Sequence, residues 1–419
     1  MAVTIDYAAL LAPDLPAPAP GWQGRPPYNF IGGHVDAASM PVEDMIAATA
    51  AVLRRDGATL STYGLESGPL GYQPLREFVA AKLGKRSGMS ISADQVLITS
   101  GSIQALDLVN GMFCCPGDTV LVEQFTYAGA LSRLRGLGVT PIGIPLDESG
   151  MRADLLAAKL AELKAQAIQP KFIYVIPTVQ NPDGSIMPEA RRAELLEVSA
   201  EYGVPIFEDE CYADLLWTGE RPPAIAAMDR RQQVIHCGSF SKTIAPALRV
   251  GYIVAEPNLV AQMAACKEDG GTGALEQMML SEYCRGHFDD HVAKVTVLLK
   301  EKLDVMIEAL EENFGTTAEF TPPPGGIFLW VTFPDVVDAT KLATAAAARG
   351  VTINPGPDWS ADAAPARSRI RLCFGNPTAD AIREGVKVLA DVCHEEFGIP
   401  VRSANVERNG LTGRQRRFR

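Results

Sequence analysis

The sequence predicts an α/β protein with two domains: a large domain built on a mainly parallel, seven-stranded sheet covered by helices, and a smaller α+β domain. Seven apolar segments have the length of strands, at residues 96–99, 119–123, 140–144, 172–176, 205–208, 234–237 and 250–255. Helical segments separate several of them, at 103–113, 128–137 and 188–202, and this alternation is typical of a parallel sheet with both faces covered. Polar residues follow several strand ends, where such sheets bind ligands.

The length of 419 residues allows two domains of ordinary size. We expect an N-terminal arm and part of the small domain at 1–40, the large domain at 41–288 and the small domain at 289–400. Residues 12–27 are rich in Pro, Ala and Gly, and they are interpreted as an extended arm. Residues 401–419 contain six arginines and one glutamate without periodicity, which predicts a flexible basic tail.

Composition excludes several classes of function. A net charge of −12 without a basic stripe before the tail argues against general nucleic-acid binding. The eight cysteines lack metal-ligand spacing, so we expect free thiols and no metal site. The N-terminus has no signal-peptide pattern, and no apolar run of about 18 residues predicts a membrane span. The expected location is the cytoplasm.

The segment 238–252, GSFSKTIAPALRVGY, carries the strongest chemical signal. It places Ser239 and Ser241 directly before Lys242, with Arg249 downstream. Two hydroxyls and a guanidinium suit a bound phosphate monoester, and a lysine beside a phosphate can form a Schiff base with an aldehyde. Together these features suggest pyridoxal 5′-phosphate (PLP), although a solvated surface lysine is the alternative from this segment alone.

Two other candidate positions come earlier in the chain. Gly32 and Gly33 allow the backbone to approach a ligand closely, although a plain turn explains them equally well. A helix is predicted at 41–54, and another begins near Pro74. Between these helices, Tyr63 lies in a loop punctuated by glycines and has no special meaning by itself.

Strand ends supply further candidates. Ser102 and Ile103 open a helix directly after the strand 96–99, where backbone N–H groups and the Ser102 hydroxyl could bind an anion. Ile103 can offer only its backbone N–H, and a capped helix after a tight turn is the alternative. Tyr127 follows the strand 119–123, where its ring could stack on a ligand or serve as an ordinary core residue.

The next two strand ends carry an amide and a group of acids. Asn181 lies in VQNPDG after the strand 172–176, although Asn-Pro followed by Gly is also a turn signature. Asp209 and Tyr212 lie in FEDECYADL after the strand 205–208. Glu208, Asp209 and Glu210 could instead form a solvated acidic turn or bind a hard metal ion.

The C-terminal part predicts the smaller domain. Helices are expected at 278–284 and 291–310, and strands at 327–331 and 369–374. Arg371 lies inside the second strand between apolar neighbours, an expensive position for a charge without a partner. An arginine on an edge strand facing water is the alternative.

These motifs together, over residues 28–376, resemble the class I/II aminotransferases, the fold type I PLP enzymes, and particularly the subgroup of 2-aminoadipate and kynurenine aminotransferases. The shared patterns are Tyr-Gly-x-x-x-Gly at Tyr63, Asn-Pro-x-Gly at Asn181, Asp-x-x-Tyr at Asp209, and Ser-x-Ser-Lys with Pro-x-Leu-Arg-x-Gly-Tyr around Lys242. The resemblance implies that Lys242 carries the internal aldimine and that Asp209 keeps the pyridine nitrogen protonated. It also implies cofactor contacts from Ser102, Ile103, Tyr127, Asn181, Tyr212, Ser239, Ser241 and Arg249.

The resemblance further implies that Arg371 grips the substrate α-carboxylate with Asn181, beside Gly33. Tyr63 would reach the cofactor of a neighbouring subunit, so a homodimer is expected. The implied reaction is ping-pong transamination between an α-amino acid and a 2-oxo acid, with Lys242 moving the proton. Other PLP reactions on amino acids, namely β-elimination, decarboxylation, racemisation or oxidation, are the first alternative. A non-catalytic PLP-binding regulator is the second.

Overall fold

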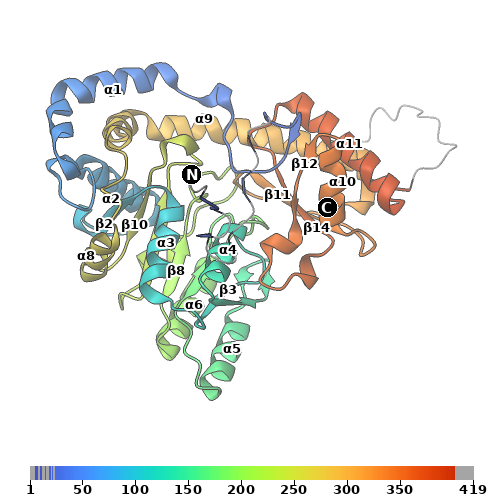
Figure 1. Ribbon diagram of the computed structural model, residues 1–419, viewed down its shortest axis with the longest axis horizontal. Coiled ribbons are helices and arrows are strands. Elements are labelled where there is room, and N and C mark those ends of the chain that lie inside the picture. The colour runs from blue at the N-terminus through green and yellow to red at the C-terminus, as the bar shows by residue number, and fades with distance from the viewer. Residues whose placement is uncertain are drawn as a thin grey trace.

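A seven-stranded sheet forms the centre of the computed structural model, which describes residues 5–7, 10–11, 15, 18–19, 21 and 24–401 (Figure 1). In spatial order its strands are β2 (Val96–Thr99), β10 (Gly251–Val254), β9 (Val234–Ser239), β8 (Ile206–Asp209), β7 (Ile173–Val175), β3 (Thr119–Glu123) and β4 (Thr140–Ile144). Both pairings of β10 are antiparallel, and the other neighbouring pairs are parallel. The predicted mainly parallel sheet is confirmed.

Helices cover both faces of this sheet because its strands are buried on both sides. On one face, Val120 and Val122 pack with α3 (Ser102–Phe113), α4 (Ala128–Gly136) and α8 (Pro257–Cys266). On the other, Leu121 packs with α5 (Ala153–Ala165), α6 (Glu189–Tyr202) and α7 (Ile225–Met228). Successive strand side chains point to opposite faces, so neighbouring residues of β3 belong to different cores.

A third core joins the β2–β10 end of the sheet to α1 (Val42–Asp56), α2 (Gln73–Ser87) and α9 (Ala274–Phe314). The sequence predicted two helices, at 278–284 and 291–310, where the structure has this single helix of 41 residues. Gly286 lies between the two predicted helices, and an interior glycine costs about 1 kcal/mol of helix stability. Burial of Phe288 and His291 outweighs that local preference.

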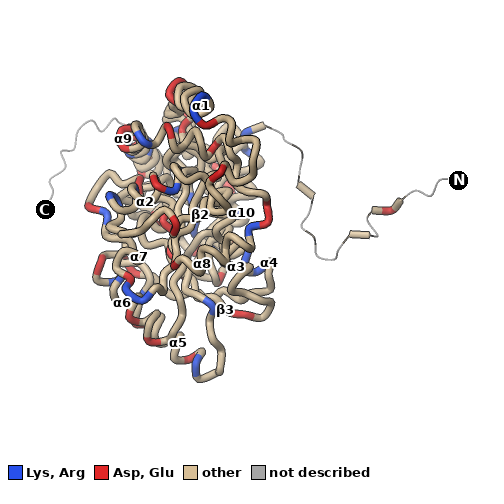
Figure 2. Tube along the Cα trace, turned by 90° about the vertical axis from the view of Figure 1, so that its left-hand side faces the viewer, with Lys and Arg blue, Asp and Glu red and all other residues tan. Residues whose placement is uncertain are grey.

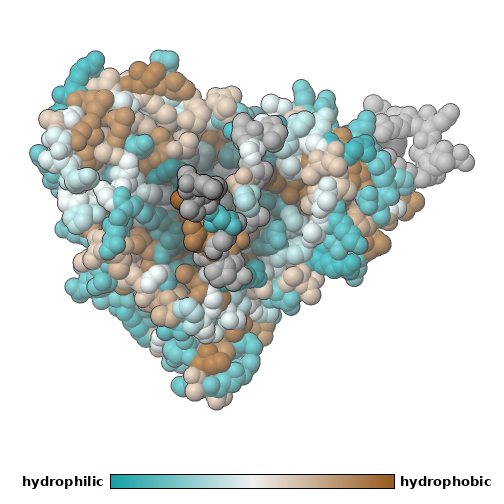
Figure 3. All heavy atoms as spheres, viewed as in Figure 1, coloured by the Kyte–Doolittle hydropathy of each residue, from teal (hydrophilic) through white to brown (hydrophobic). Residues whose placement is uncertain are grey.

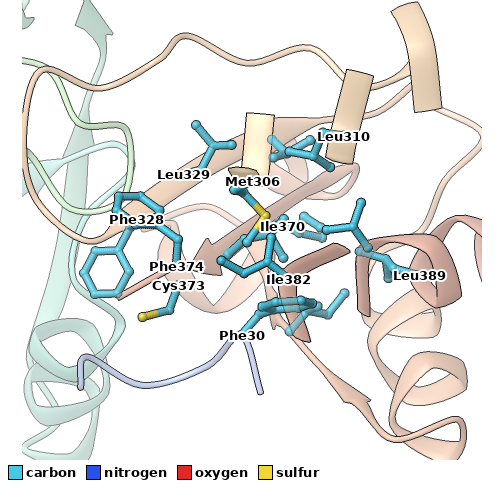
Figure 4. Close-up of a cluster of buried hydrophobic side chains, with 14 of the residues drawn as sticks. Phe30, Met306, Leu310, Phe328, Leu329, Ile370, Cys373, Phe374, Ile382 and Leu389 are labelled. Carbon is cyan, nitrogen blue, oxygen red and sulfur yellow. The ribbon is translucent and has the colours of Figure 1, made fainter. Parts of the chain in front are cut away.

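The smaller sheet lies beside the C-terminal half of α9 (Figure 1). Its order is β11 (Phe328–Thr332), β14 (Arg369–Cys373) and β13 (Asn354–Pro355), and all its pairings are antiparallel. Helices α10 (Ala339–Ala348) and α11 (Ala379–Phe397) flank it. Figure 4 shows the core between these elements, where Phe30, Met306, Ile370 and Leu389 meet.

Short elements complete the described chain. The N-terminal strand β1 (Tyr28–Asn29) pairs in parallel with β12 (Val351–Thr352), so it joins the C-terminal unit in space. A small hairpin pairs β5 (Leu146–Asp147) with β6 (Gly150–Met151). The eight 3₁₀ turns among the described residues are η2 (Ala37–Ser39), η3 (Gly57–Ser61), η4 (Tyr63–Glu66), η5 (Ala93–Gln95), η6 (Pro246–Leu248), η7 (Gly315–Thr317), η8 (Gly356–Trp359) and η9 (Ala364–Ala366).

Charges of both signs are interspersed along the chain trace (Figure 2). Within the described part of the chain, no helix has the length and apolar character needed to cross a bilayer. All eight cysteines are free. Most of the predicted arm at 12–27, and the predicted tail beyond residue 401, lie outside the described residues.

Candidate active site

A cavity of about 310 Å³ lies where the carboxyl ends of the large-sheet strands meet the smaller sheet. Among its lining residues are most of the positions that the sequence singled out: Gly33, Ser102, Ile103, Tyr127, Asn181, Asp209, Tyr212, Ser241, Lys242, Arg249 and Arg371. Ser239 lies directly beside the cavity, because its hydroxyl accepts a hydrogen bond from the Ser241 N–H at 3.0 Å. Residues separated by more than 300 positions therefore converge on one site.

One end of the cavity is built to receive an anion. The start of α3 has no side-chain cap, so its first N–H groups are available to a ligand. Arg249 closes this end: its Nη1 donates to Ser241 Oγ at 3.4 Å and its Nη2 to the Ser100 carbonyl at 3.1 Å. Gly101 is required here, because a Cβ would lie 2.3 Å from Arg249 Nη2 and its φ is +80°.

Lys242 extends its amine into the middle of the cavity. Its Nζ donates to the Gly33 carbonyl at 3.0 Å, and a Cβ at Gly33 would lie only 2.4 Å from that nitrogen. Burial lowers the pKa of the Lys242 ammonium, and the nearby charges of Arg371 and Arg249 lower it further. A lysine whose pKa is depressed in this way supplies the free amine that a carbonyl carbon needs.

Asp209 lies at the end of β8 and is held by neutral donors. Tyr174 Oη donates to its Oδ2 at 2.8 Å, and the Cys211 backbone N–H donates to its Oδ1 at 3.2 Å. The carboxylate is only 5% exposed. A buried carboxylate with neutral partners keeps its charge available to a ligand cation.

The acids on either side of Asp209 face other partners. Glu208 contacts His236 Nδ1 at 2.8 Å, and Glu210 pairs with Arg221 and, at 3.4 Å, with Arg192. All three acids are buried, so the alternative of a solvated acidic turn is wrong. Strand alternation sends Glu208 to the opposite face of the sheet from Asp209. Within the described residues, no cluster of His, Cys, Asp and Glu could hold a metal ion.

Arg371 lies on β14, the central strand of the smaller sheet, and is 3% exposed. The edge-strand alternative is therefore wrong. Its Nη1 donates to Asn181 Oδ1 at 3.1 Å and its Nη2 to the Gly32 carbonyl at 3.2 Å. The guanidinium lies between the rings of Phe328 and Trp359, 3.7 and 3.6 Å from their centroids. Burial lowers the pKa of Arg371 to about 10.

Asn181 connects this arginine to the phenol of Tyr212. Its Nδ2 donates to Tyr212 Oη at 3.4 Å, while its Oδ1 accepts from Arg371. Tyr127 forms part of another wall, with its ring 5.9 Å from that of Trp359. Burial raises the pKa of both phenols, so they are neutral donors near pH 7.

The structure does not bring Tyr63 to this cavity. Tyr63 is 94% exposed and lines a different cavity, of about 890 Å³, together with Leu60 and Gln277. Conversely, sequence reasoning did not select Phe328, Trp359 or Asn354, which line the main cavity. Trp359 comes from the turn η8, whose sequence has no periodic or motif signal. Tyr174 was part of a predicted strand, but only its buried contact with Asp209 reveals a site role.

These residues fit a phosphorylated aldehyde and a carboxylate together. The uncapped start of α3, Ser241 and Arg249 suit a phosphate group. Lys242 can bond covalently to an aldehyde, and Asp209 can pair with a ring N–H. Arg371 has a buried Nε without a partner among the described residues, which suits an incoming carboxylate.

Comparisons with known proteins identify the family. The family model described as aminotransferase class I and II matches residues 35–389. An aromatic-amino-acid aminotransferase of Thermococcus litoralis is 37% identical over 88% of this chain and 88% of its own. A solved kynurenine aminotransferase of Pyrococcus horikoshii, in complex with PMP, is 36% identical, with a TM-score of 0.83 over 90% of this chain and 92% of that one.

A second solved structure is an α-aminoadipate aminotransferase of Thermus thermophilus, in complex with N-(5′-phosphopyridoxyl)-L-leucine. It is 32% identical, with a TM-score of 0.80 over 88% of this chain and 93% of that one. These likenesses confirm the expected fold type I architecture. The chain therefore belongs to the class I and II aminotransferase family.

Proposed function

We propose that the cavity holds pyridoxal 5′-phosphate and that the protein transfers an amino group between an α-amino acid and a 2-oxo acid in a ping-pong reaction. The observation that carries this proposal is the position of Lys242 Nζ. It lies in one cavity with an anion-binding end at Arg249, a buried carboxylate at Asp209 and a buried guanidinium at Arg371. Relatives that are named as aminotransferases or transaminases align with most of the chain, and this favours transamination over the other reactions of the cofactor.

Each residue has a distinct task in this reaction. Arg371 and Asn181 hold the α-carboxylate and so fix the orientation of the α-carbon. Lys242, once its amine is free, removes the proton from the α-carbon and delivers it to the acceptor atom. Asp209 holds a proton on the ring nitrogen, while Asn181 and Tyr212 donate to the ring oxygen. The bound cofactor supplies an electron sink for the electron pair that the α-carbon releases.

Further contacts hold the cofactor in place. Ser102, Ile103, Ser239, Ser241 and Arg249 bind its phosphate, Ile103 through its backbone N–H alone. Tyr127 covers one face of the ring. Gly33 leaves room for the Lys242 amine, because a side chain at Gly33 would occupy its position.

A half-reaction tests the proposal directly. The purified holoenzyme is mixed with an excess of one amino acid, without an acceptor. We expect the absorbance of the lysine-bound cofactor to be replaced by that of its amine form, with one equivalent of 2-oxo acid released per site. Release of ammonia or carbon dioxide, or inversion of the α-carbon, would instead support elimination, decarboxylation or racemisation. Aromatic amino acids, kynurenine and 2-aminoadipate form the first donor panel, with 2-oxoglutarate and pyruvate as acceptors.

We also infer that the protein works as a homodimer in which Tyr63 reaches the cofactor phosphate of the neighbouring site. Tyr63 does not line the main cavity of its own chain and is 94% exposed. Apolar side chains on and after α1 are also exposed, including Val42, Ile46 and Leu60, and Figure 3 shows hydrophobic surface over α1. A second copy of the chain would cover such surface.

Subunit complementation distinguishes a shared site from a separate one. Tyr63→Ala and Lys242→Ala are each expected to be nearly inactive. A mixed dimer would contain one site with both residues intact only if Tyr63 serves the neighbouring subunit. If equal amounts of the two variants pair at random, about half of the dimers are mixed and each has one intact site, so about a quarter of wild-type activity should return. No gain over the separate variants would mean that Tyr63 does not act across an interface.

Domain organisation and location complete the proposal. We propose a large domain at 41–288 and a small one at 289–400, so that the boundary falls inside α9. Residues of the 1–40 segment contribute β1, which pairs with β12. The eight free thiols support a cytoplasmic location, where thiols stay reduced.

A further inference from the structure

Three buried N–H donors without partners lie in one row across the smaller sheet. Trp330 on β11 and Asn354 on β13 both pair directly with Arg371 on the central strand β14. Residues that face each other across antiparallel strands project to the same side of a sheet. Trp330 Nε1, Arg371 Nε and Asn354 Nδ2 are all buried, and none has a hydrogen-bond partner among the described residues.

Unpaired buried donors are uncommon in native proteins, because each costs about 1–3 kcal/mol. Two of these three, on Arg371 and Asn354, belong to residues that line the main cavity, whereas Trp330 does not line it. We propose that Asn354 is a substrate-binding residue whose side-chain amide donates to the α-carboxylate beside Arg371. This proposal rests on the proposed function, since it assigns a second donor to the same substrate group.

The donor count supports the assignment. A guanidinium has five N–H groups. Two of those on Arg371 are used by Asn181 and Gly32, which leaves three. A carboxylate presents about four lone-pair sites on two oxygens. A bidentate contact with Arg371 leaves an outer lone pair on the carboxylate, and the neighbouring strand places the Asn354 amide on the same side of the sheet.

Substitutions at Asn354 test this placement. Asn354→Leu removes the donor at similar volume and should weaken carboxylate binding about tenfold to a hundredfold, the range for a hydrogen bond to a charged group. Asn354→Asp should weaken it further, because the new carboxylate would pair with Arg371 and occupy the substrate position. If the leucine variant fails to fold, Asn354→Ala removes the same donor. Binding is measured by calorimetry on the holoenzyme with 3-phenylpropanoate, which has a carboxylate but no amino group to react.

Two comparisons separate this role from a structural one. Phenethylamine, which lacks a carboxylate, should react with the Asn354 variants as it does with the wild type. Asn110→Leu replaces a buried asparagine on α3, outside the cavity lining, and should leave carboxylate affinity within about twofold. Affinities of Asn354→Leu and Asn354→Asp within twofold of wild type would overturn the proposal, as would an aspartate variant that binds no more weakly than the leucine variant. A wild-type protein that never acquires cofactor absorbance would instead refute the proposed function.

Discussion

Replacing Arg371 with alanine is the sharpest test of how the cavity recognises its substrate. The guanidinium is 3% exposed, lies between Phe328 and Trp359, and is oriented by hydrogen bonds to Asn181 and Gly32. Its plane is therefore fixed before any ligand arrives. A fixed fork of donors binds a carboxylate without first losing the side-chain freedom that an exposed arginine would lose.

The size of the effect follows from this burial. Because the site excludes water on both faces of the guanidinium, solvent cannot replace the lost donors in the alanine variant. Removing one partner of a buried, hydrogen-bonded charge pair costs about 2–5 kcal/mol. At 1.4 kcal/mol for each factor of ten, amino-acid affinity should fall by about 30-fold to several thousand-fold. The affinity of a simple amine, which has no carboxylate, should fall only slightly.

Single-turnover kinetics with phenylalanine and with phenethylamine measure this difference. Arg371→Lys keeps a positive charge but not the planar fork, so it should recover only part of the affinity for phenylalanine. Arg369→Ala is the matched control: Arg369 is on the same strand and stacks on Phe125, but does not line the cavity. Equal losses for the two ligands in Arg371→Ala would refute the carboxylate-binding role.

Three further predictions concern the amine, a buried acid and a buried cation. Lys242→Ala should abolish the visible absorbance of the lysine-bound cofactor, and an unchanged spectrum would reject this lysine. Burial raises the pKa of Glu123 well above 4.5, the ordinary value of a glutamate side chain. The folded protein therefore binds more protons than the unfolded one above pH 4.5, and its stability falls as pH rises toward the folded-state pKa. Glu123→Gln should flatten this decline in urea unfolding at pH 5 to 8, and parallel wild-type and variant curves would contradict the assignment. Arg192 is fully buried and contacts Glu210, so Arg192→Leu should cost about 3–5 kcal/mol of unfolding free energy. Arg231→Leu, at an exposed ion pair, should cost less than about 1 kcal/mol in the same urea titration, and similar losses would refute the burial argument.

Local patterns predicted the large sheet well because its strands are short apolar segments with helices between them. They failed at α9, where the sequence predicted two helices and the structure has one. The continuity of α9 depends on packing against α1, α2 and α11, which are distant in sequence. A weak local preference for a break could not reveal that tertiary contact.

The candidate site was predictable where a motif coincides with a strand end, as at Asp209 and Lys242. The neighbours of Arg371 could not be predicted, because Trp330 and Asn354 become adjacent to it only when the three strands pair. The sequence left open whether Arg371 faced water, and the answer required the order of those strands. For Tyr63 the sequence implied a role that a single chain cannot test, because that role requires the site of a neighbouring subunit.

The charge distribution explains why this cavity suits anions in a chain whose formal net charge is −12. Lys242, Arg249 and Arg371 line it together with the single carboxylate of Asp209, which gives three positive charges, one negative charge and a formal excess of +2. The alternation of β8 produces this excess, because Glu208 faces the opposite side of the sheet, and Glu210 pairs with arginines outside the cavity lining. An excess of positive charge in a partly enclosed site is unfavourable unless a ligand compensates it. A phosphate group with a charge near −2 would compensate this formal excess, which counts Lys242 as protonated. Because burial depresses the pKa of Lys242, Arg371 is the cation that the site offers to a substrate carboxylate.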